Sequence, residues 1–311
     1  MTTQNATLPQ TATATRSKPK RDLPLGKQLL YQAILLFVAF ITAFPILWVV
    51  SLSLDPRDIS RPTDLNLLPP GASLKAYEKV MAQPTANPVT FGELALNSLK
   101  LGLGTALFST MIGVSAAYVF SRFDFRGRRF LMLMVLMVLM LPSIGTIAPL
   151  FVMLNKVTIG TGSTAFNLRN SLWGVGLAIV SGALPFAIWN LKGYLDTIPR
   201  DLEEAGRIDG ASYNQVFFQI ILPLAVPALA VTTFLGFLSG WTEFALSWQF
   251  LTQPKDFTLS MSLWNMTGQY SGQVPWSNFA AMALLVATPV AIVYLALQKY
   301  IIGGLTVGSV K

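Results

Sequence analysis

Few side chains in this sequence have the types and spacing that catalysis requires. The 311 residues include no His and no Cys, which excludes imidazole bases, thiol nucleophiles and the usual zinc clusters. No G-x-x-x-x-G-K-[ST] phosphate-binding loop is present, because the single Gly26-Lys27 pair is followed by Gln. Carboxylates and hydroxyls remain, but the hydrophobic segments hold no plausible acid and base pair. We therefore predict no catalytic residue, no metal ligand and no cofactor bound by this chain.

The informative polar residues lie in the segment 197–223, where their spacing predicts a mechanical element. Pro199 suits the first turn of a helix, and three acidic residues follow where the positive end of the helix dipole favours them. These acidic residues are Asp201, Glu203 and Glu204. Spacing also places an apolar trio on one face of this helix, namely Leu202, Ala205 and Ile208. We expect a short helix that protrudes from the protein and exposes this apolar face.

The same segment predicts a sharp turn into a second helix. Gly210 can adopt the left-handed conformation that commonly ends a helix. Ser212 and Gln215 then match the S-x-x-Q capping box at the start of another helix. We call the resulting helix-turn-helix, residues 197–223, the elbow.

The elements that position the elbow are hydrophobic segments long enough to cross a membrane. Hydrophobic residues make up 53% of the chain and charged residues 12%, about half the charged share of a soluble protein. Six apolar segments reach the length of about 20 residues that spans the hydrocarbon, and only helices satisfy their own backbone there. They cover residues 28–54, 101–121, 130–155, 170–191, 224–248 and 277–298. Prolines within them predict bent helices around a cavity.

The distribution of basic residues orients these helices. If the N-terminus is inside, 14 of the 22 Lys and Arg residues fall on the inner side, in segments that include the elbow. Because cytoplasmic segments carry the excess of Lys and Arg, we expect both termini and the elbow in the cytoplasm. Residues 1–27 would form a cytoplasmic tail, of which residues 1–20 are expected to be disordered and to lie near anionic lipid. The net charge of +8 is scattered between spans, so membrane orientation explains it better than nucleic-acid binding.

The elbow resembles the EAA loop of ABC importer permeases, whose pattern is E-A-A, three residues, G, nine residues and I-x-L-P. The matching residues are Glu204, Ala205, Gly210, Ile220, Leu222 and Pro223, and the one departure is Gly206 for the second Ala. In that family the loop docks in a cleft of the ATP-binding subunit. The resemblance therefore implies a coupling loop formed by Leu202, Glu203, Glu204, Ala205, Gly206, Asp209, Gly210, Ile220, Leu222 and Pro223. The substitution by Gly206 would affect only the tightness of docking.

The resemblance extends from about Tyr31 to the C-terminus and favours the carbohydrate branch, where the smaller permease of maltose and maltodextrin importers is most similar. It rests on Asn97-Ser98-Leu99, Lys192-Gly193-Tyr194 and residues 202–205, 209–211, 222–227 and 304–311. It implies an all-α integral membrane protein with six transmembrane helices and the type I ABC importer transmembrane fold. The transmembrane domain would cover residues 28–311, with a permease core at about 94–302.

The resemblance also implies partners and a location. The partners would be a second permease subunit, two copies of an ATP-binding subunit that use ATP, and an extracellular or periplasmic sugar-binding protein. The location would be a bacterial or archaeal cytoplasmic membrane. In the maltose type the other permease makes most glycan contacts, so this chain would complete the path and couple it to the ATPase subunits.

Three further features have two interpretations each. Trp264, Tyr270 and Trp276 lie in an outer loop that reaches the binding protein in the maltose type, so we predict that contact, with an interfacial aromatic belt as the alternative. The basic hairpin 122–129 is expected to anchor topology at the headgroups, with a second docking surface as the alternative. Glu243 could face the pathway or make a structural contact.

Two other functions remain open from the sequence alone. A permease of this type could carry another solute, such as a different oligosaccharide or glycerol phosphate. A self-sufficient secondary carrier is the alternative of a different class. Such carriers usually place ionisable groups deep inside their helices, whereas here only Lys100 and Glu243 approach a span, each toward an end.

Overall fold

The computed structural model describes residues 24–57, 67–160, 166–268 and 274–307. The chain divides into two compact units, residues 1–47 and 48–311. Helix α1 (Leu25–Ser53) forms the described part of the first unit and continues into the second. Its 29 residues give a length of about 43 Å, more than the ~30 Å of a hydrocarbon core. Most of the predicted tail, residues 1–27, lies outside the described residues.

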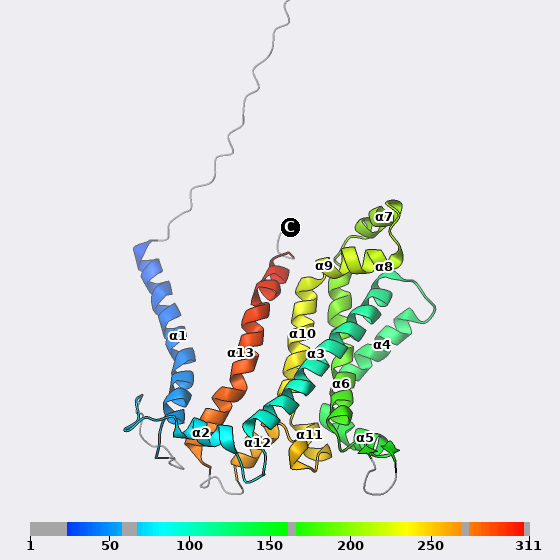
Figure 1. Ribbon diagram of the computed structural model, residues 1–311. Coiled ribbons are helices and arrows are strands. Elements are labelled where there is room, and N and C mark those ends of the chain that lie inside the picture. Colours follow the sequence, from blue (N-terminus) through cyan, green and yellow to red (C-terminus); the bar gives the residue numbers. More distant parts are fainter. Residues whose placement is uncertain (1–23, 58–66, 161–165, 269–273, 308–311) are drawn as a thin grey trace, which may run out of the picture. The chain divides into compact units, whose positions relative to one another are not determined.

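Four long helices form the core of the second unit (Figure 1). Helix α3 (Phe91–Arg122) packs against both α6 (Leu172–Leu195) and α10 (Val226–Trp241), and α10 also packs against α13 (Trp276–Val307). The crossing of α3 and α10 is close because small residues meet there. A Cβ atom added to Gly240 would lie only 2.4 Å from the carbonyl oxygen of Leu101. Small residues at such crossings let helix backbones approach in a membrane.

The predicted span 130–155 is a bent pair of helices and not one continuous helix, in line with the bends that its prolines predict. Helix α4 (Arg128–Leu139) and helix α5 (Ser143–Asn155) follow each other with a bend of 102°. Pro142 lies at this break and disfavours helical geometry in the residue before it. Helix α4 alone covers about 18 Å, which is shorter than the hydrocarbon core.

The other predicted spans are confirmed as long apolar helices with shifted ends. Helix α3 begins at Phe91, ten residues before the predicted span, so Lys100 lies within it. The predicted span 224–248 is interrupted after Trp241 and resumes as α11 (Ala245–Phe250). Five spans of the described chain are long and apolar enough to cross a membrane, and counting the bent pair as one span gives six.

Short elements occupy the two ends of the second unit (Figure 1). One end carries the elbow, which contains α7 (Asp201–Ile208), α8 (Tyr213–Gln215), the π-helix η2 (Val216–Ile221) and the first two residues of α9 (Leu222–Leu224). The opposite end carries α2 (Lys75–Ala82), the 3₁₀ helix η3 (Pro254–Asp256) and α12 (Leu259–Met266). Strands β1 (Thr158–Ile159) and β2 (Phe166–Asn167) form an antiparallel pair in which Thr158 faces Asn167.

Candidate functional site

The first arm of the elbow is the eight-residue helix α7, as the sequence predicts. Its first turn holds the three acidic residues, but Pro199 precedes the N-cap residue Arg200 instead of lying inside the helix. Gly210 has a φ of 89° and ends the helix. The Gly210 N–H donates to the Arg207 carbonyl at 3.0 Å, and the Ala211 N–H donates to the Gly206 carbonyl at 3.0 Å. These two bonds form a Schellman motif, which satisfies carbonyls at the helix end.

The second arm of the elbow starts with the predicted capping box. The Gln215 N–H donates to the Ser212 hydroxyl at 3.3 Å, and the Ser212 N–H donates to the Gln215 side chain at 2.8 Å. The arm does not continue as a regular α-helix, because η2 and α9 follow. Pro223 lies near the start of α9, where its ring removes an N–H donor and disturbs the preceding turn. The π-helix comes directly before that disturbance.

Gly206 faces the second arm of the elbow. A Cβ atom at this position would lie 2.6 Å from Cδ1 of Ile220 and 3.7 Å from Cγ2 of Val216. Val216 is buried and Ile220 is half-buried, so this contact belongs to the small core that joins the two arms. The departure from the E-A-A pattern thus also bears on packing inside the elbow, and its effect on docking stays a prediction.

The opposite face of α7 is exposed and lacks a partner within the described chain. Leu202 is 43% exposed and Ile208 is 86% exposed, and Glu204, Ala205 and Asp209 are exposed as well. No ion pair involves Glu204 among the described residues. An apolar and acidic surface of this kind is typical of a docking element, because water-exposed leucine and isoleucine gain from burial in a partner.

Glu203, the neighbour of Glu204, anchors α7 to the end of α3. Its carboxylate forms an ion pair with Arg122 and accepts a hydrogen bond of 3.2 Å from the Tyr118 hydroxyl. The Arg122 and Glu203 side chains are 7% and 13% exposed. Arg122 also donates to the carbonyl of Ile198 at 3.0 Å. Sequence reasoning treated Arg122 as part of a topology anchor and missed this pair, although adjacent glutamates on a helix must point about 100° apart.

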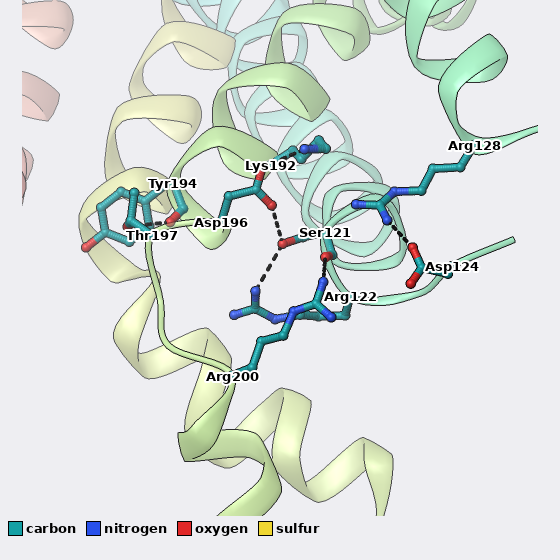
Figure 2. A network of polar contacts seen from close by, with 9 residues as sticks. All are labelled: Ser121, Arg122, Asp124, Arg128, Lys192, Tyr194, Asp196, Thr197 and Arg200. Carbon is teal, nitrogen blue, oxygen red and sulfur yellow. Dashed lines mark hydrogen bonds and ion pairs between the residues drawn. The ribbon is translucent and has the colours of Figure 1, made fainter.

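A second set of polar contacts holds the segment 196–200, which joins α6 to α7 and which we call the root of the elbow (Figure 2). The Ser121 hydroxyl donates to Asp196 at 2.6 Å, and the Lys192 ammonium contacts the other carboxylate oxygen at 2.5 Å. Burial opposes ionisation of Asp196, but the hydrogen bonds from Lys192 and Ser121 outweigh it and hold its pKa below the ordinary value. Arg200 donates to the backbone carbonyl of Ser121 at 3.1 Å. The ends of α3 and α6 are therefore joined to the start of α7.

A cavity of about 1050 Å³ lies toward the opposite end, between α3 and α6. Lys100, Asn170 and Trp173 contribute to its lining, together with Lys255. Thr105 also lines it, and its buried hydroxyl has no hydrogen-bond partner within the described chain. Sequence reasoning anticipated a cavity but did not identify these residues, because α3 and α6 are far apart in sequence.

Two of the three predicted outer aromatic residues lie at this same opposite end. Trp264 belongs to α12, is 54% exposed and contacts Phe244 with ring centroids 5.3 Å apart. Trp276 begins α13 and contacts Phe279 edge to face at 5.9 Å. Tyr270 lies outside the described residues. The structure therefore places two of the three predicted residues at one end, both partly accessible.

Polar residues that the sequence singled out elsewhere have structural contacts. The Glu243 carboxylate accepts from the backbone N–H groups of Leu246 at 2.6 Å and Ser247 at 2.9 Å, so it caps α11. Asn97 donates to the carbonyls of Lys255 at 2.7 Å and Phe257 at 3.0 Å. The contacts of Glu243 favour its structural interpretation. The contacts of Asn97 join the first half of α3 to the segment around η3.

Comparisons with known proteins point to one family. Residues 109–306 match the family described as "Binding-protein-dependent transport system inner membrane component". The galactooligosaccharides transport system permease protein GanQ of Bacillus subtilis (strain 168) is 34% identical over 91% of this chain and 96% of its own length. The trehalose transport system permease protein SugB of Mycobacterium tuberculosis (strain CDC 1551 / Oshkosh) is 32% identical over 86% and 92%.

A further relative is named for maltose, and one solved structure has a similar fold. The maltose/maltodextrin transport system permease protein MalG of Yersinia pestis is 32% identical over 89% of this chain and 91% of its own length. A chain of a bacterial ABC transporter involved in the import of the acidic polysaccharide alginate has a TM-score of 0.73 with 21% identity, covering 90% of this chain and 99% of that chain. This last likeness concerns the fold.

Proposed function

The chain belongs to the family of inner membrane components of binding-protein-dependent transport systems and is a non-catalytic ABC sugar importer permease, and we propose that its cargo is a maltose- or maltodextrin-type sugar. It is a multi-pass membrane protein of a prokaryotic importer. Because the chain belongs to this family, the alternative hypothesis of a self-sufficient secondary carrier is set aside. Relatives named for maltose or maltodextrin support the proposed cargo.

Galactooligosaccharides and trehalose are competing candidates for the cargo, because relatives of similar identity are named for them. The relatives named for galactooligosaccharides and trehalose have identities of 34% and 32%, close to the 32% of the maltose relative. Uptake should be measured in cells with radiolabelled maltotriose, trehalose and a galactooligosaccharide, before and after deletion of this chain. We expect the deletion to remove maltotriose uptake selectively. Selective loss of either other sugar would overturn the proposed cargo.

We propose that the elbow couples this chain to an ATP-binding subunit that uses ATP. The observation that carries this proposal is the division of α7 into an anchored face and an exposed face. Glu203 is tied to the end of α3 through Arg122, whereas Leu202, Glu204 and Ile208 are exposed. A partner that moves the exposed face would therefore pull on α3 and, through the root of the elbow, on α6.

The proposed complex contains a second permease subunit, two copies of the ATP-binding subunit and an extracellular or periplasmic sugar-binding protein. The elbow end would face the cytoplasm and the cavity between α3 and α6 would form this chain's half of the path. Trp264, Tyr270 and Trp276 would contact the binding protein. Co-purification from native membranes should recover the two other kinds of membrane-bound subunit with this chain. Recovery of the chain alone under gentle extraction would count against the assembly.

A further inference from the structure

A polar pocket lies at the elbow end, separate from the exposed face of α7. It encloses about 400 Å³ at the junction of α3, α4 and α6. Its lining includes Ser121, Arg122, Arg128, Asp196, Thr197 and Arg200. Figure 2 shows these side chains gathered around the end of α3. We propose that this pocket, the headgroup pocket, binds the phosphate of an anionic phospholipid.

The charges in the headgroup pocket do not balance. Arg122 is paired with Glu203 and Arg128 is paired with Asp124, whereas the Asp196 carboxylate already contacts Lys192. Arg200 has no carboxylate partner within the described chain, and its guanidinium donates only to the Ser121 carbonyl. One guanidinium therefore keeps an uncompensated positive charge and free N–H donors. Guanidinium groups suit phosphate because their planar donors match its oxygens in a bidentate arrangement.

The position of the headgroup pocket matches the depth of lipid phosphates. Helices α3 and α6 end at Arg122 and Leu195, and α4 begins at Arg128, so the ends of three apolar helices meet here, where membrane helices would reach the headgroup layer. Basic pockets between such helices are typical sites for anionic headgroups. A free carboxylate or inorganic anion in solution would have no special reason to sit at this depth.

Apolar side chains beside the pocket could continue the contact to an acyl chain. Phe123 and Phe125 on the α3–α4 hairpin are 40% and 36% exposed, and Phe130 in the first turn of α4 is 59% exposed. Exposed leucine and methionine side chains follow along α4, including Leu131, Leu133, Met134 and Met137. A phosphate with an attached hydrocarbon chain therefore fits this region better than a protein carboxylate. Figure 1 also shows α7, the proposed partner surface, extending beyond the ends of the spans.

The test compares lipid selectivity of the assembled complex that contains the full chain, reconstituted in nanodiscs. Trace spin-labelled phosphatidylglycerol or phosphatidylcholine is added, and electron paramagnetic resonance measures the fraction of each lipid held at the protein. We expect Arg200→Gln to lower the preference for phosphatidylglycerol about fivefold, the factor for one basic side chain at an anionic membrane surface. The matched control is Arg126→Gln, which removes the same charge from an exposed residue of the nearby α3–α4 hairpin that does not line the pocket.

Each outcome decides for or against the headgroup pocket. A loss of preference in Arg200→Gln with wild-type preference in Arg126→Gln supports it. Equal losses in both variants, or no loss in either, would show only diffuse surface attraction and overturn it. Arg200-dependent binding of inorganic phosphate in phosphatidylcholine nanodiscs, without a phosphatidylglycerol preference, would assign a free anion instead. Unchanged lipid preference with loss of ATP-binding subunits from the Arg200→Gln complex would assign a partner carboxylate.

Discussion

Two neighbouring glutamates on α7 have different surroundings, and this difference defines the elbow at the scale of single residues. Glu203 lies against Arg122 and Tyr118, whereas Glu204 is exposed. The two side chains differ only by one helical step of about 100°, which turns one inward and the other outward. An acidic pair in the sequence therefore contains one anchoring residue and one residue available to a partner.

The first prediction separates these two roles. Glu203→Gln should leave the buried Arg122 charge without its carboxylate, at a cost of up to about 3–5 kcal/mol for a buried pair. Glu204→Gln should change stability by less than about 0.5 kcal/mol, because the side chain is exposed. Thermal unfolding in detergent should show the difference, and uptake should fall in both variants. Equal melting temperatures for the two variants would contradict the anchoring role of Glu203.

The second prediction concerns Gly210, whose φ of 89° is costly for a residue with a side chain. Gly210→Val should strain the turn by about 1–2 kcal/mol or more and reorient α7. No atom lies within 4 Å of the added Cβ, so the effect comes from the backbone alone. We expect the variant to reach the membrane but to lose uptake or the response of ATPase activity to substrate.

A matched control exists in the hairpin between α3 and α4. Gly127 has a φ of 90° and also has no atom within 4 Å of an added Cβ. Gly127→Val should therefore impose a similar strain without turning α7, and uptake should persist at matched membrane levels. Wild-type uptake by Gly210→Val, or equal loss in both variants, would show that the elbow is a passive linker.

Glu204→Lys adds a charge reversal to the exposed face and should also abolish uptake.

At the scale of elements, close helix crossings hold the second unit together. Gly236 and Gly240 on α10 approach the backbone of α3 around Leu101 and Ala106, and Gly113 on α3 meets Ala187 on α6. These crossings depend on missing side chains, since lipid gives apolar helices no hydrophobic reason to associate. The same packing places the ends of α3 and α6 side by side, where the elbow is rooted.

The third prediction tests the tightest crossing. Gly240→Ala places a Cβ 2.4 Å from the Leu101 carbonyl oxygen, a backbone atom that cannot move aside easily. We expect a loss of about 1–3 kcal/mol, as for overpacked cores. Gly182→Ala on α6 is the control, because its added Cβ would meet no atom within 4 Å. Equal melting temperatures for Gly240→Ala and Gly182→Ala would contradict the prediction that the α3–α10 crossing has no room for a side chain at residue 240.

At the scale of the whole molecule, the two proposed contact surfaces lie at opposite ends of the second unit. Figure 1 shows α7 and α8 of the elbow at one end and α12 with the start of α13 at the other. The headgroup pocket lies beside the elbow, whereas Trp264 belongs to α12 and Trp276 begins α13. An importer must respond to ATP on one side of the membrane and to its sugar supply on the other. The helices α3, α6 and α10 connect these two ends.

The fourth prediction concerns membrane orientation. Reporters inserted in the hairpin 122–129 and fused after Lys311 should both report the cytoplasm, and a reporter inserted at residues 253–256 should report the outside. Basic residues around the elbow and the hairpin favour retention on the inner side. An external signal from either of the first two positions would refute the six-span arrangement.

The fifth prediction concerns the outer aromatic residues. Replacing Trp264, Tyr270 and Trp276 together with Ser should weaken the stimulation of ATPase activity by liganded binding protein while leaving the complex assembled. The reason is the loss of large exposed apolar contact area, which often dominates protein interfaces. Reconstituted ATPase rates and subunit stoichiometry measure the two effects. Normal stimulation would assign these residues to an interfacial aromatic belt.

The sequence by itself determined the features that depend on neighbouring residues. Apolar length predicted the long helices, because a span in lipid must satisfy its own backbone. Gly210 predicted the left-handed turn and Ser212 predicted the capping box, since both depend on contacts within a few residues. The spacing of Glu204, Gly210 and Pro223 also predicted the family to which the chain belongs.

Only the tertiary structure decided the features that join distant segments. Arg122 and Glu203 are 81 residues apart in the sequence, and Ser121 and Asp196 are 75 residues apart. No local sequence pattern predicts contacts over such separations. The inward position of Gly206 depends on how the second arm packs, and Pro142 predicted a bend between α4 and α5 but not its angle of 102°. Local hydrogen bonding and hydrophobic length fix each helix, whereas the directions of side chains between helices are fixed by packing alone.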